Sequence, residues 1–121
     1  MEYMILIYSD ERAWASFDEA ALKAEYKKYI DYTKELMASG VLRGGSELKP
    51  STTATTVRVR GGKVLTTDGP YAETKDQLGG YYLIDVPNLD EAVRWATKCP
   101  GSAYGSCEVR PLNPSPAPEA G

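Results

Sequence analysis

Two segments of the chain are apolar on both of their alternating sides, and this pattern limits the folds open to it. Residues 3–8 read YMILIY, and residues 81–86 read YYLIDV, in which Asp85 is the one charged side chain. Runs this short and this rich in β-formers favour strands over helices. Because alternate side chains of a strand point to opposite faces of a sheet, both strands need apolar cover on two sides.

A first helix is predicted between these strands, over about residues 17–38. Ser16 and Glu19 have the spacing of a capping box, which makes Ser16 the expected N-cap. Gly40 is expected to end the helix, since glycine enters the left-handed cap conformation freely. The apolar spacing predicts an inward stripe made of Leu22, Tyr26, Tyr29, Thr33 and Leu36.

A second helix is predicted after Pro87, which ends the strand before it. Asn88 and Glu91 repeat the capping-box spacing, and Pro100-Gly101 is expected to end the helix. Its buried stripe is predicted to hold Leu89, Ala92, Val93 and Ala96.

Extended segments account for the rest of residues 1–112. Residues 41–49 read as a strand that Gly44-Gly45 loosens, and residues 106–110 form a short last strand. Residues 55–60 and 63–67 flank Gly61-Gly62, which predicts a β-hairpin. The order β-α-β-hairpin-β-α-β is that of an α+β protein with the ferredoxin-like split βαβ arrangement and an inserted hairpin.

This arrangement leaves one face of the sheet without cover. Two helices cover only one face of a four-stranded sheet, and an open apolar face is a liability for a monomer. We therefore expect a homodimer that packs sheet against sheet. Residues 1–112 are expected to form a single domain, and residues 113–121, with three prolines and no large apolar side chain, are expected to be disordered.

The absence of histidine excludes several classes of function. Ser-His-Asp and Cys-His catalysis and histidine-ligated metal sites all need this residue, so we expect no metal and no cofactor. With 14 basic and 17 acidic residues and no basic stripe, the chain shows no signature of nucleic-acid binding. No apolar run reaches the length of a membrane span, and no secretory signal is evident. Cys99 and Cys107 could form one disulfide, and the sequence does not determine their redox state; without a secretory signal we expect a reduced, cytoplasmic protein.

Residues 66–80 form the most distinctive stretch and allow two interpretations. In the first, Asp68-Gly69-Pro70 is a turn, because aspartate bonds the backbone two residues on and proline restricts φ. In the second, the turn presents a carboxylate beside Tyr71, Glu73 and Lys75, a set capable of general acid–base chemistry. The spacing alone does not choose between them.

The same stretch, TTDGPYAETK followed by QLGGYY, resembles the signature of the DGPF-domain branch of YCII-related proteins, with Tyr71 in place of phenylalanine. The resemblance spans residues 1–112. It implies a dimeric α+β barrel with a cleft between sheet and helices, in bacterial proteins some of which are associated with sigma factors. A related branch uses a His–Asp pair, and some of its members remove chloride from chlorinated hydroquinones. Without histidine, only Asp68 and Glu73 carry over as catalytic candidates.

Two functions follow as expectations. The first is a cofactor-free enzyme acting on a small polar or aromatic molecule, with Asp68 as acid or base and Glu73 orienting the substrate. Its ligand-binding candidates are Tyr8, Tyr29, Tyr71 and Lys75. The second is a non-catalytic module that binds a small ligand or assists a sigma factor. For Tyr8, Tyr26 and Tyr29, packing in the core is the simpler alternative to lining a ligand cleft.

Overall fold

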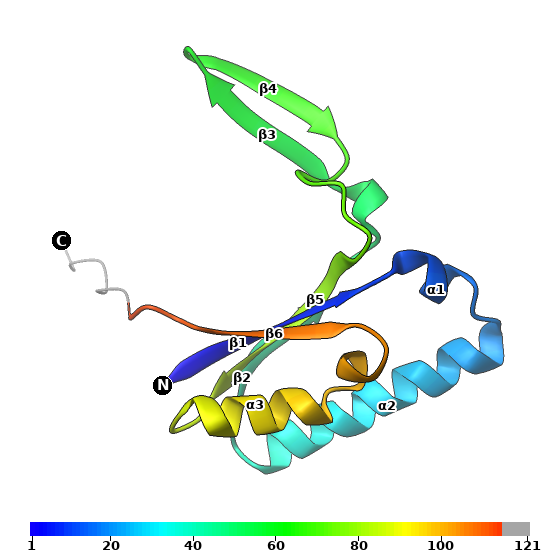
Figure 1. Ribbon diagram of the computed structural model, residues 1–121, viewed down its shortest axis with the longest axis vertical. Helices are drawn as coiled ribbons and strands as arrows, with labels where there is room; N and C mark the ends of the chain where they lie inside the picture. Colours follow the sequence, from blue (N-terminus) through cyan, green and yellow to red (C-terminus); the bar gives the residue numbers. More distant parts are fainter. Residues whose placement is uncertain (115–121) are drawn as a thin grey trace.

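The computed structural model describes residues 1–114 and shows an α+β fold of two layers. One layer is a four-stranded sheet in the order β2-β5-β1-β6, with every neighbouring pair antiparallel. Its strands are β1 (Glu2–Ser9), β2 (Leu42–Glu47), β5 (Gln77–Asp85) and β6 (Ser106–Pro111). The other layer consists of α2 (Glu19–Ala38) and α3 (Leu89–Lys98) on one face of the sheet (Figure 1). This order confirms the predicted split βαβ arrangement.

Strand β1 lies at the centre of the sheet, bonded to β5 on one edge and to β6 on the other. From Tyr3 to Ser9 its side chains alternate between buried and half-buried positions. Tyr3, Ile5, Ile7 and Ser9 are buried toward the helices. The apolar pattern of residues 3–8 therefore supplies the core with one set of side chains and the opposite face with the other.

Helix α2 begins later than predicted, because Asp18 caps it instead of Ser16. The Asp18 carboxylate accepts a hydrogen bond from the amide of Ala21 at 2.8 Å. Ser16 instead ends a short helix, α1 (Glu11–Ala15), which the sequence pattern did not predict. The predicted end is confirmed, with Gly40 in the left-handed region at φ 73°. In residues 1–114, no helix has the length and apolar character needed to cross a membrane.

The core lies between the sheet and the two helices, but the helix stripes differ from those predicted. Helix α2 buries Tyr32 and Leu36, and α3 buries Ala92, Trp95 and Ala96. Leu89 and Val93, predicted to be buried, are 51% and 47% exposed. The reason is that α3 contacts the sheet through a narrow stripe that includes Trp95, so its other apolar positions lie on the flank. A short 3-10 turn, η2 (Pro100–Ala103), follows α3.

The predicted hairpin forms, but it does not join the main sheet. β3 (Thr55–Arg60) and β4 (Lys63–Asp68) pair only with each other, and Gly61 and Gly62 turn the chain at φ 56° and 77°. The 3-10 turn η1 (Ser51–Thr53) lies at its base. Residues 55–68, here called the arm, project from the sheet on the side opposite the helices (Figure 1).

The sheet face opposite the helices, here called the outer face, is apolar. Half-buried side chains from the two central strands meet on it in cross-strand pairs, Leu6 opposite Tyr81 and Met4 opposite Leu83, with Tyr8 opposite Leu78 past a register shift. No helix in residues 1–114 covers this face (Figure 1). The expectation that the helices leave one apolar face open is therefore confirmed.

We predict that Leu36→Ala destabilises the protein by about 2–5 kcal/mol, because Leu36 is fully buried and its truncation leaves a cavity in the core. Urea unfolding at equilibrium measures the change. Met37→Ala, one residue further along α2 at a side chain that is 63% exposed, serves as the control and is expected to change the free energy of unfolding by less than about 0.5 kcal/mol. Equal losses in the two variants would contradict the assigned helix orientation.

Candidate functional site

A cleft of about 1310 Å³ opens between helix α2 and the β2 edge of the sheet. It is lined along α2 by a second apolar stripe, distinct from the buried one, that includes Tyr26, Ile30 and Met37. These three side chains are 38%, 53% and 63% exposed. Apolar groups this exposed on the helix that flanks a cavity indicate a binding surface more than a core.

Glycines make the opposite wall of the cleft. Gly44 and Gly45 lie in β2 and line the cleft together with Gly79 and Gly80 of β5. A Cβ atom at Gly45 would lie 2.8 Å from the carbonyl oxygen of Tyr81, and one at Gly80 would lie 2.9 Å from that of Ser46. The two strands can therefore approach this closely only with glycine at these positions, and the wall is left without side chains there.

A phenol and a carboxylate provide the clearest polar pair in the cleft. The Tyr26 hydroxyl donates a hydrogen bond to Oε1 of Glu47 at 2.8 Å, which links α2 to the end of β2. This hydrogen bond to the carboxylate, together with partial burial, raises the pKa of Tyr26. Oε2 of Glu47 makes no protein hydrogen bond within residues 1–114, so it is available to accept one from a ligand.

The short helix α1 forms one end of the cleft and is held there by aromatic packing. The Trp14 ring lies within 5.6–6.3 Å of four other rings, which belong to Phe17, Tyr26, Tyr29 and Tyr104. The Tyr29 and Tyr104 hydroxyls are 3.1 Å apart and share a hydrogen bond. Trp14 is thus a packing residue that keeps α1 in place.

A smaller cavity of about 490 Å³ lies on the other side of Trp14. Lys75 and Asp76 of the distinctive stretch line it, together with Asp10 and Phe17. The side-chain hydrogen bond from Arg12 lowers the pKa of Asp10 to about 2, and Lys75 adds to this effect through its charge. Lys75, predicted to bind a ligand, therefore belongs to this cavity and does not line the main cleft.

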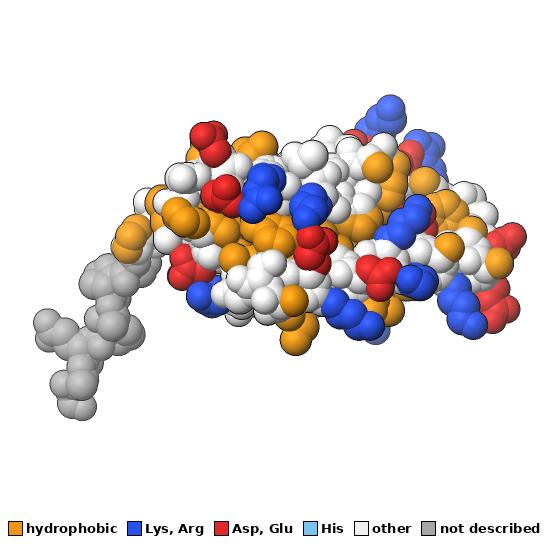
Figure 2. Space-filling model, turned by 90° about the horizontal axis from the view of Figure 1, so that it is seen from below, with side chains coloured by type: hydrophobic (Ala, Val, Ile, Leu, Met, Phe, Trp, Pro, Cys, Tyr) orange, Lys and Arg blue, Asp and Glu red, His pale blue; other side chains and the backbone are white. Residues whose placement is uncertain are grey.

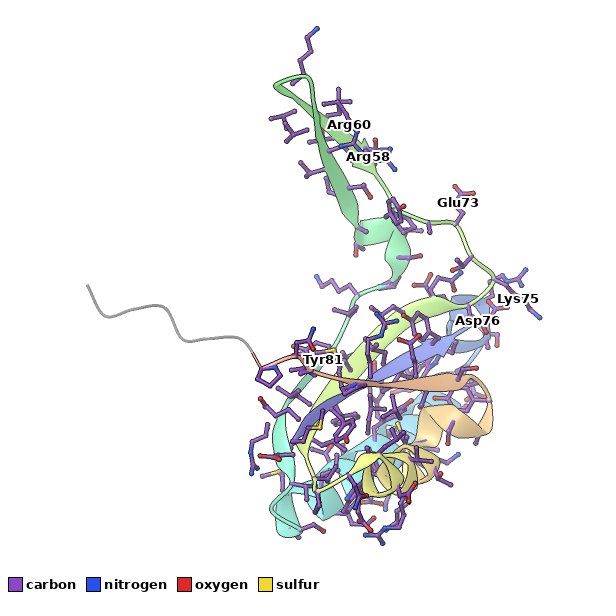
Figure 3. The ribbon with its side chains drawn as sticks, turned by 60° about the vertical axis from the view of Figure 1, so that its left-hand side comes forward. Arg58, Arg60, Glu73, Lys75, Asp76 and Tyr81 are labelled. Atoms are coloured by element: carbon purple, nitrogen blue, oxygen red, sulfur yellow. The ribbon has the colours of Figure 1, made fainter. Side chains whose placement is uncertain are left out.

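The predicted catalytic carboxylates lie outside both cavities. Asp68 is exposed at the end of β4, opposite Thr55. Glu73 is exposed in the loop between the arm and β5, away from Tyr81 on the sheet (Figure 3). Tyr71 is 78% exposed, and the Arg58 guanidinium lies 5.5 Å from its ring centroid. Within one chain, the structure does not bring Asp68, Glu73 and Tyr71 to the cleft.

The two remaining predicted ligand residues lie on opposite faces of the sheet. Tyr29 lines the cleft, and its burial raises the pKa of its hydroxyl well above the ordinary range. Tyr8 lies on the outer face, because the alternation along β1 directs Ile7 and Ser9 toward the cleft. Tyr26 and Glu47 line the cleft together with Tyr29.

The distinctive stretch mainly fastens the arm to the body. Its first half closes the base of the arm, where the Gly69 amide donates to the Ala54 carbonyl at 2.7 Å and Gly69 has φ 104°. Its second half holds α1, since Oε1 of Gln77 accepts a hydrogen bond from the Glu11 amide at 3.0 Å. The Glu11 carboxylate in turn accepts hydrogen bonds from the amide and the hydroxyl of Ser51 at the base of the arm. These contacts give the stretch a structural role, in which Asp68 ends β4 and Gly69 bends the chain.

Sequence reasoning missed most of the cleft wall. The pairs Gly44-Gly45 and Gly79-Gly80 were the signals that could have revealed it, because glycine inside a strand marks a close approach of another backbone. Ile30 and Met37 also lie off the predicted inward stripe of α2, and such positions on an otherwise solvated helix face point to a second surface.

The two cysteines are free thiols, as expected, and lie beside each other near η2. Cys99 is buried in the core and Cys107 packs against it. The hydrogen bond from Cys107 to Cys99 and the burial of Cys107 raise the pKa of the Cys107 thiol. The same hydrogen bond lowers the pKa of the Cys99 thiol. Cys99 is nevertheless a structural side chain, because it is buried and reactive cysteines are exposed.

These features define a small α+β protein whose main cleft is lined by tyrosines, glycines and apolar side chains. Within residues 1–114, no three metal-ligating side chains gather at one place.

Comparison with known families identifies the family of this protein. The YCII-related domain matches residues 1–115, so the chain belongs to the YCII-related family. An uncharacterized protein of Rhizobium meliloti strain 1021 is 39% identical over 121 residues, a match that covers 93% of this chain and 92% of that protein. The resemblance noted from the sequence is thereby confirmed at the level of the family.

We predict that the protein loses stability as the pH rises above about 10. Burial raises the pKa of Tyr29, Tyr32, Tyr82 and Tyr104 above the ordinary value of 10.0. As the pH rises above about 10, the unfolded chain releases these protons before the folded protein does, so the free energy of unfolding falls. Below about pH 10 these groups do not change the free energy of unfolding. Urea unfolding between pH 8 and 11 measures the slope. Tyr32→Phe should make the slope shallower, whereas Tyr71→Phe, at an exposed ring, should leave it unchanged.

Proposed function

We propose that the protein binds a small aromatic molecule carrying a hydroxyl group in the cleft between α2 and β2. The single observation that supports this best is the Tyr26–Glu47 pair, which is solvent-accessible on the wall of a large, mainly apolar cleft. Small-molecule sites typically combine apolar walls with a few placed polar groups, in volumes of roughly 300–1,000 Å³. The cleft exceeds that range, so space does not limit the ligand.

The chemistry of the walls indicates the class of ligand. Tyr26, Ile30 and Met37 offer aromatic and flexible apolar contact, which suits a ring. Oε2 of Glu47 accepts a hydrogen bond, so a hydroxyl on the ligand satisfies it. Three cations line the cleft but do not form a cluster of free charges, because Arg12 pairs with Asp10 and Arg43 lies near Asp85. Lys34 is the one of the three that has no ion pair within residues 1–114.

Acid–base catalysis is the second candidate function. Glu47 lines the cleft, and the hydrogen bond from Tyr26 to its Oε1 leaves Oε2 to exchange a proton with a bound hydroxyl. Asp68 and Glu73 stay predictions as catalytic residues, and Tyr8, Tyr71 and Lys75 stay predictions as ligand contacts. For these five to act at the cleft, a second copy of the chain has to bring them there.

We also propose that the protein is a homodimer joined through the outer faces of the two sheets, as in a dimeric α+β barrel. The support is the set of half-buried apolar side chains on that face, with no element of the same chain covering it in residues 1–114. Figure 2 shows that the helix side is different, with charged side chains of both signs spread among apolar ones. The outer face is therefore the better candidate for the interface.

Binding is tested with phenol and anisole, in which a methyl group replaces the hydroxyl proton of phenol. Titration of isotope-labelled protein, followed by the amide signals of Gly44 and Gly45, is expected to show that phenol binds more tightly than anisole. Glu47→Ala is expected to reduce this preference by about three- to ten-fold, because a hydrogen bond to a charged, partly solvated acceptor is lost. Asp68→Ala removes the carboxylate of the rival site on the arm, and it should leave the preference unchanged if Glu47 alone accepts the hydrogen bond of the ligand.

The outcomes separate the two sites. Equal binding of phenol and anisole, or shifts confined to signals outside the cleft, would contradict the proposed ligand site. A loss of binding in Asp68→Ala with no change in Glu47→Ala would transfer the site to the arm. The same pair of variants can be incubated with cell extract, and the small molecules retained on the protein identified by mass spectrometry, to find the natural ligand.

A further inference from the structure

The arm has two chemically different faces. The register pairs Val59 with Val64 and places Val57 on the same side, and these three residues are here called the valine face. Arg58 and Arg60 lie on the other side (Figure 3), and the register places Lys63 there opposite Arg60; these three residues are here called the basic face. The three valines are 58–68% exposed. The alternation along β3 and β4 is thus that of strands with one face buried and one face in water, although nothing in residues 1–114 buries the valines.

A hairpin of this kind is not stable by itself. An isolated two-stranded hairpin is at best marginally stable in water, and it needs a hydrophobic face packed against something else. Residues 55–68 form no hydrogen bond to the four-stranded sheet or to the helices in the part of the chain that the structure describes. Its attachment is confined to the base, where Ser51 is bound by the Glu11 carboxylate.

From these observations we infer that the arm packs its valine face against a second copy of the chain and holds that copy on the outer face of the sheet. This inference rests on the proposed homodimer and adds the arm to its interface. The arm and the outer face lie on the same side of the molecule, opposite the helices, and are set at an angle (Figure 1). A subunit seated in that angle contacts both apolar surfaces at once.

A second copy fits this position better than another protein for two reasons. A two-fold axis presents the arm and the outer face of each subunit to the other, so one symmetric contact covers all four apolar surfaces. The charges also favour it: the arm carries three cations and one carboxylate, a net charge of +2, which leaves −5 on the rest of a chain whose total is −3. Because the cations lie on the basic face, the attraction of the arm to the acidic body of its partner acts at long range while the two subunits approach, and it is not part of the contact that the valine face makes.

The inference also gives Asp68 a place in the assembly. Asp68 pairs with Thr55 at the base of the arm, and the register puts it on the same side as the valines. A subunit that covers the valine face therefore lies next to this carboxylate. In the dimer, the exposed Asp68 of the single chain becomes a residue at the edge of the interface.

The test compares apolar side chains on the two faces of the arm. Sedimentation velocity over a concentration series gives the dissociation constant of the dimer for the wild type, Val59→Ser/Val64→Ser, and Leu65→Ser. Leu65 is 49% exposed on the basic face and is the matched control. We expect the double variant to raise the dissociation constant about ten-fold or more, because two apolar side chains lose their buried contact. Leu65→Ser should change it less than two-fold.

Hydrogen exchange gives an independent measure on the same proteins. The amides of residues 55–68 are expected to be protected in the wild-type dimer and to exchange much faster in the monomer formed by Leu83→Lys on the outer face. Circular dichroism confirms that each variant stays folded, since the arm lies outside the core.

The outcomes distinguish the arm from the dimer. A wild type that stays monomeric at all concentrations overturns both proposals. A dimer whose dissociation constant is the same in Val59→Ser/Val64→Ser, or whose arm amides exchange equally fast in dimer and monomer, overturns the role of the arm and leaves the sheet interface standing. Equal weakening by Val59→Ser/Val64→Ser and Leu65→Ser would also contradict it, because the valine face would then have no special part.

Discussion

The alternation along β1 is the constraint on which the rest of the structure depends. β1 is bonded on both edges, so its position in the sheet is determined, and its side chains divide between the two faces. Tyr3, Ile5 and Ile7 join the core with Leu36 and the other buried helix residues, while Met4, Leu6 and Tyr8 make the outer face. A shift of one residue in register would exchange these two sets, which makes the alternative pairings unfavourable.

The cleft follows from how the helices cover the sheet. Helices α2 and α3 pack against the face of the sheet opposite the outer face. Beside its buried residues, α2 also carries an exposed apolar stripe that includes Ile30 and Met37. The glycines of β2 and β5 allow the edge strand to approach its neighbour closely and leave no side chains to fill the space. The cleft therefore exists because side chains do not fill the space between α2 and the β2 edge of the sheet. Tyr26 and Glu47 are its polar pair.

Local patterns were enough to predict the elements and their order. The hairpin at Gly61-Gly62, the cap at Asn88 and the end of α2 at Gly40 each depend on a few neighbouring residues, and all three are confirmed. The cap of α2 was assigned to Ser16 because Asp18 offers the same chemistry two residues later, and spacing alone does not separate them. The stretch around Asp68 was distinctive but did not reveal the cleft, because its contacts serve to join the arm, α1 and β5.

By itself, the sequence determined the α+β class, the split βαβ order, the hairpin and the presence of an apolar face that the helices leave open. These properties follow from periodicity, capping and turn residues, which act over short distances along the chain. The tertiary structure alone decided that Tyr29 lines the cleft while Tyr8 lies on the outer face. It also decided that the hairpin does not pair with the four-stranded sheet and that Tyr26 forms a hydrogen bond with Glu47. Each of these depends on register and on the placement of elements distant in sequence, which local interactions do not specify.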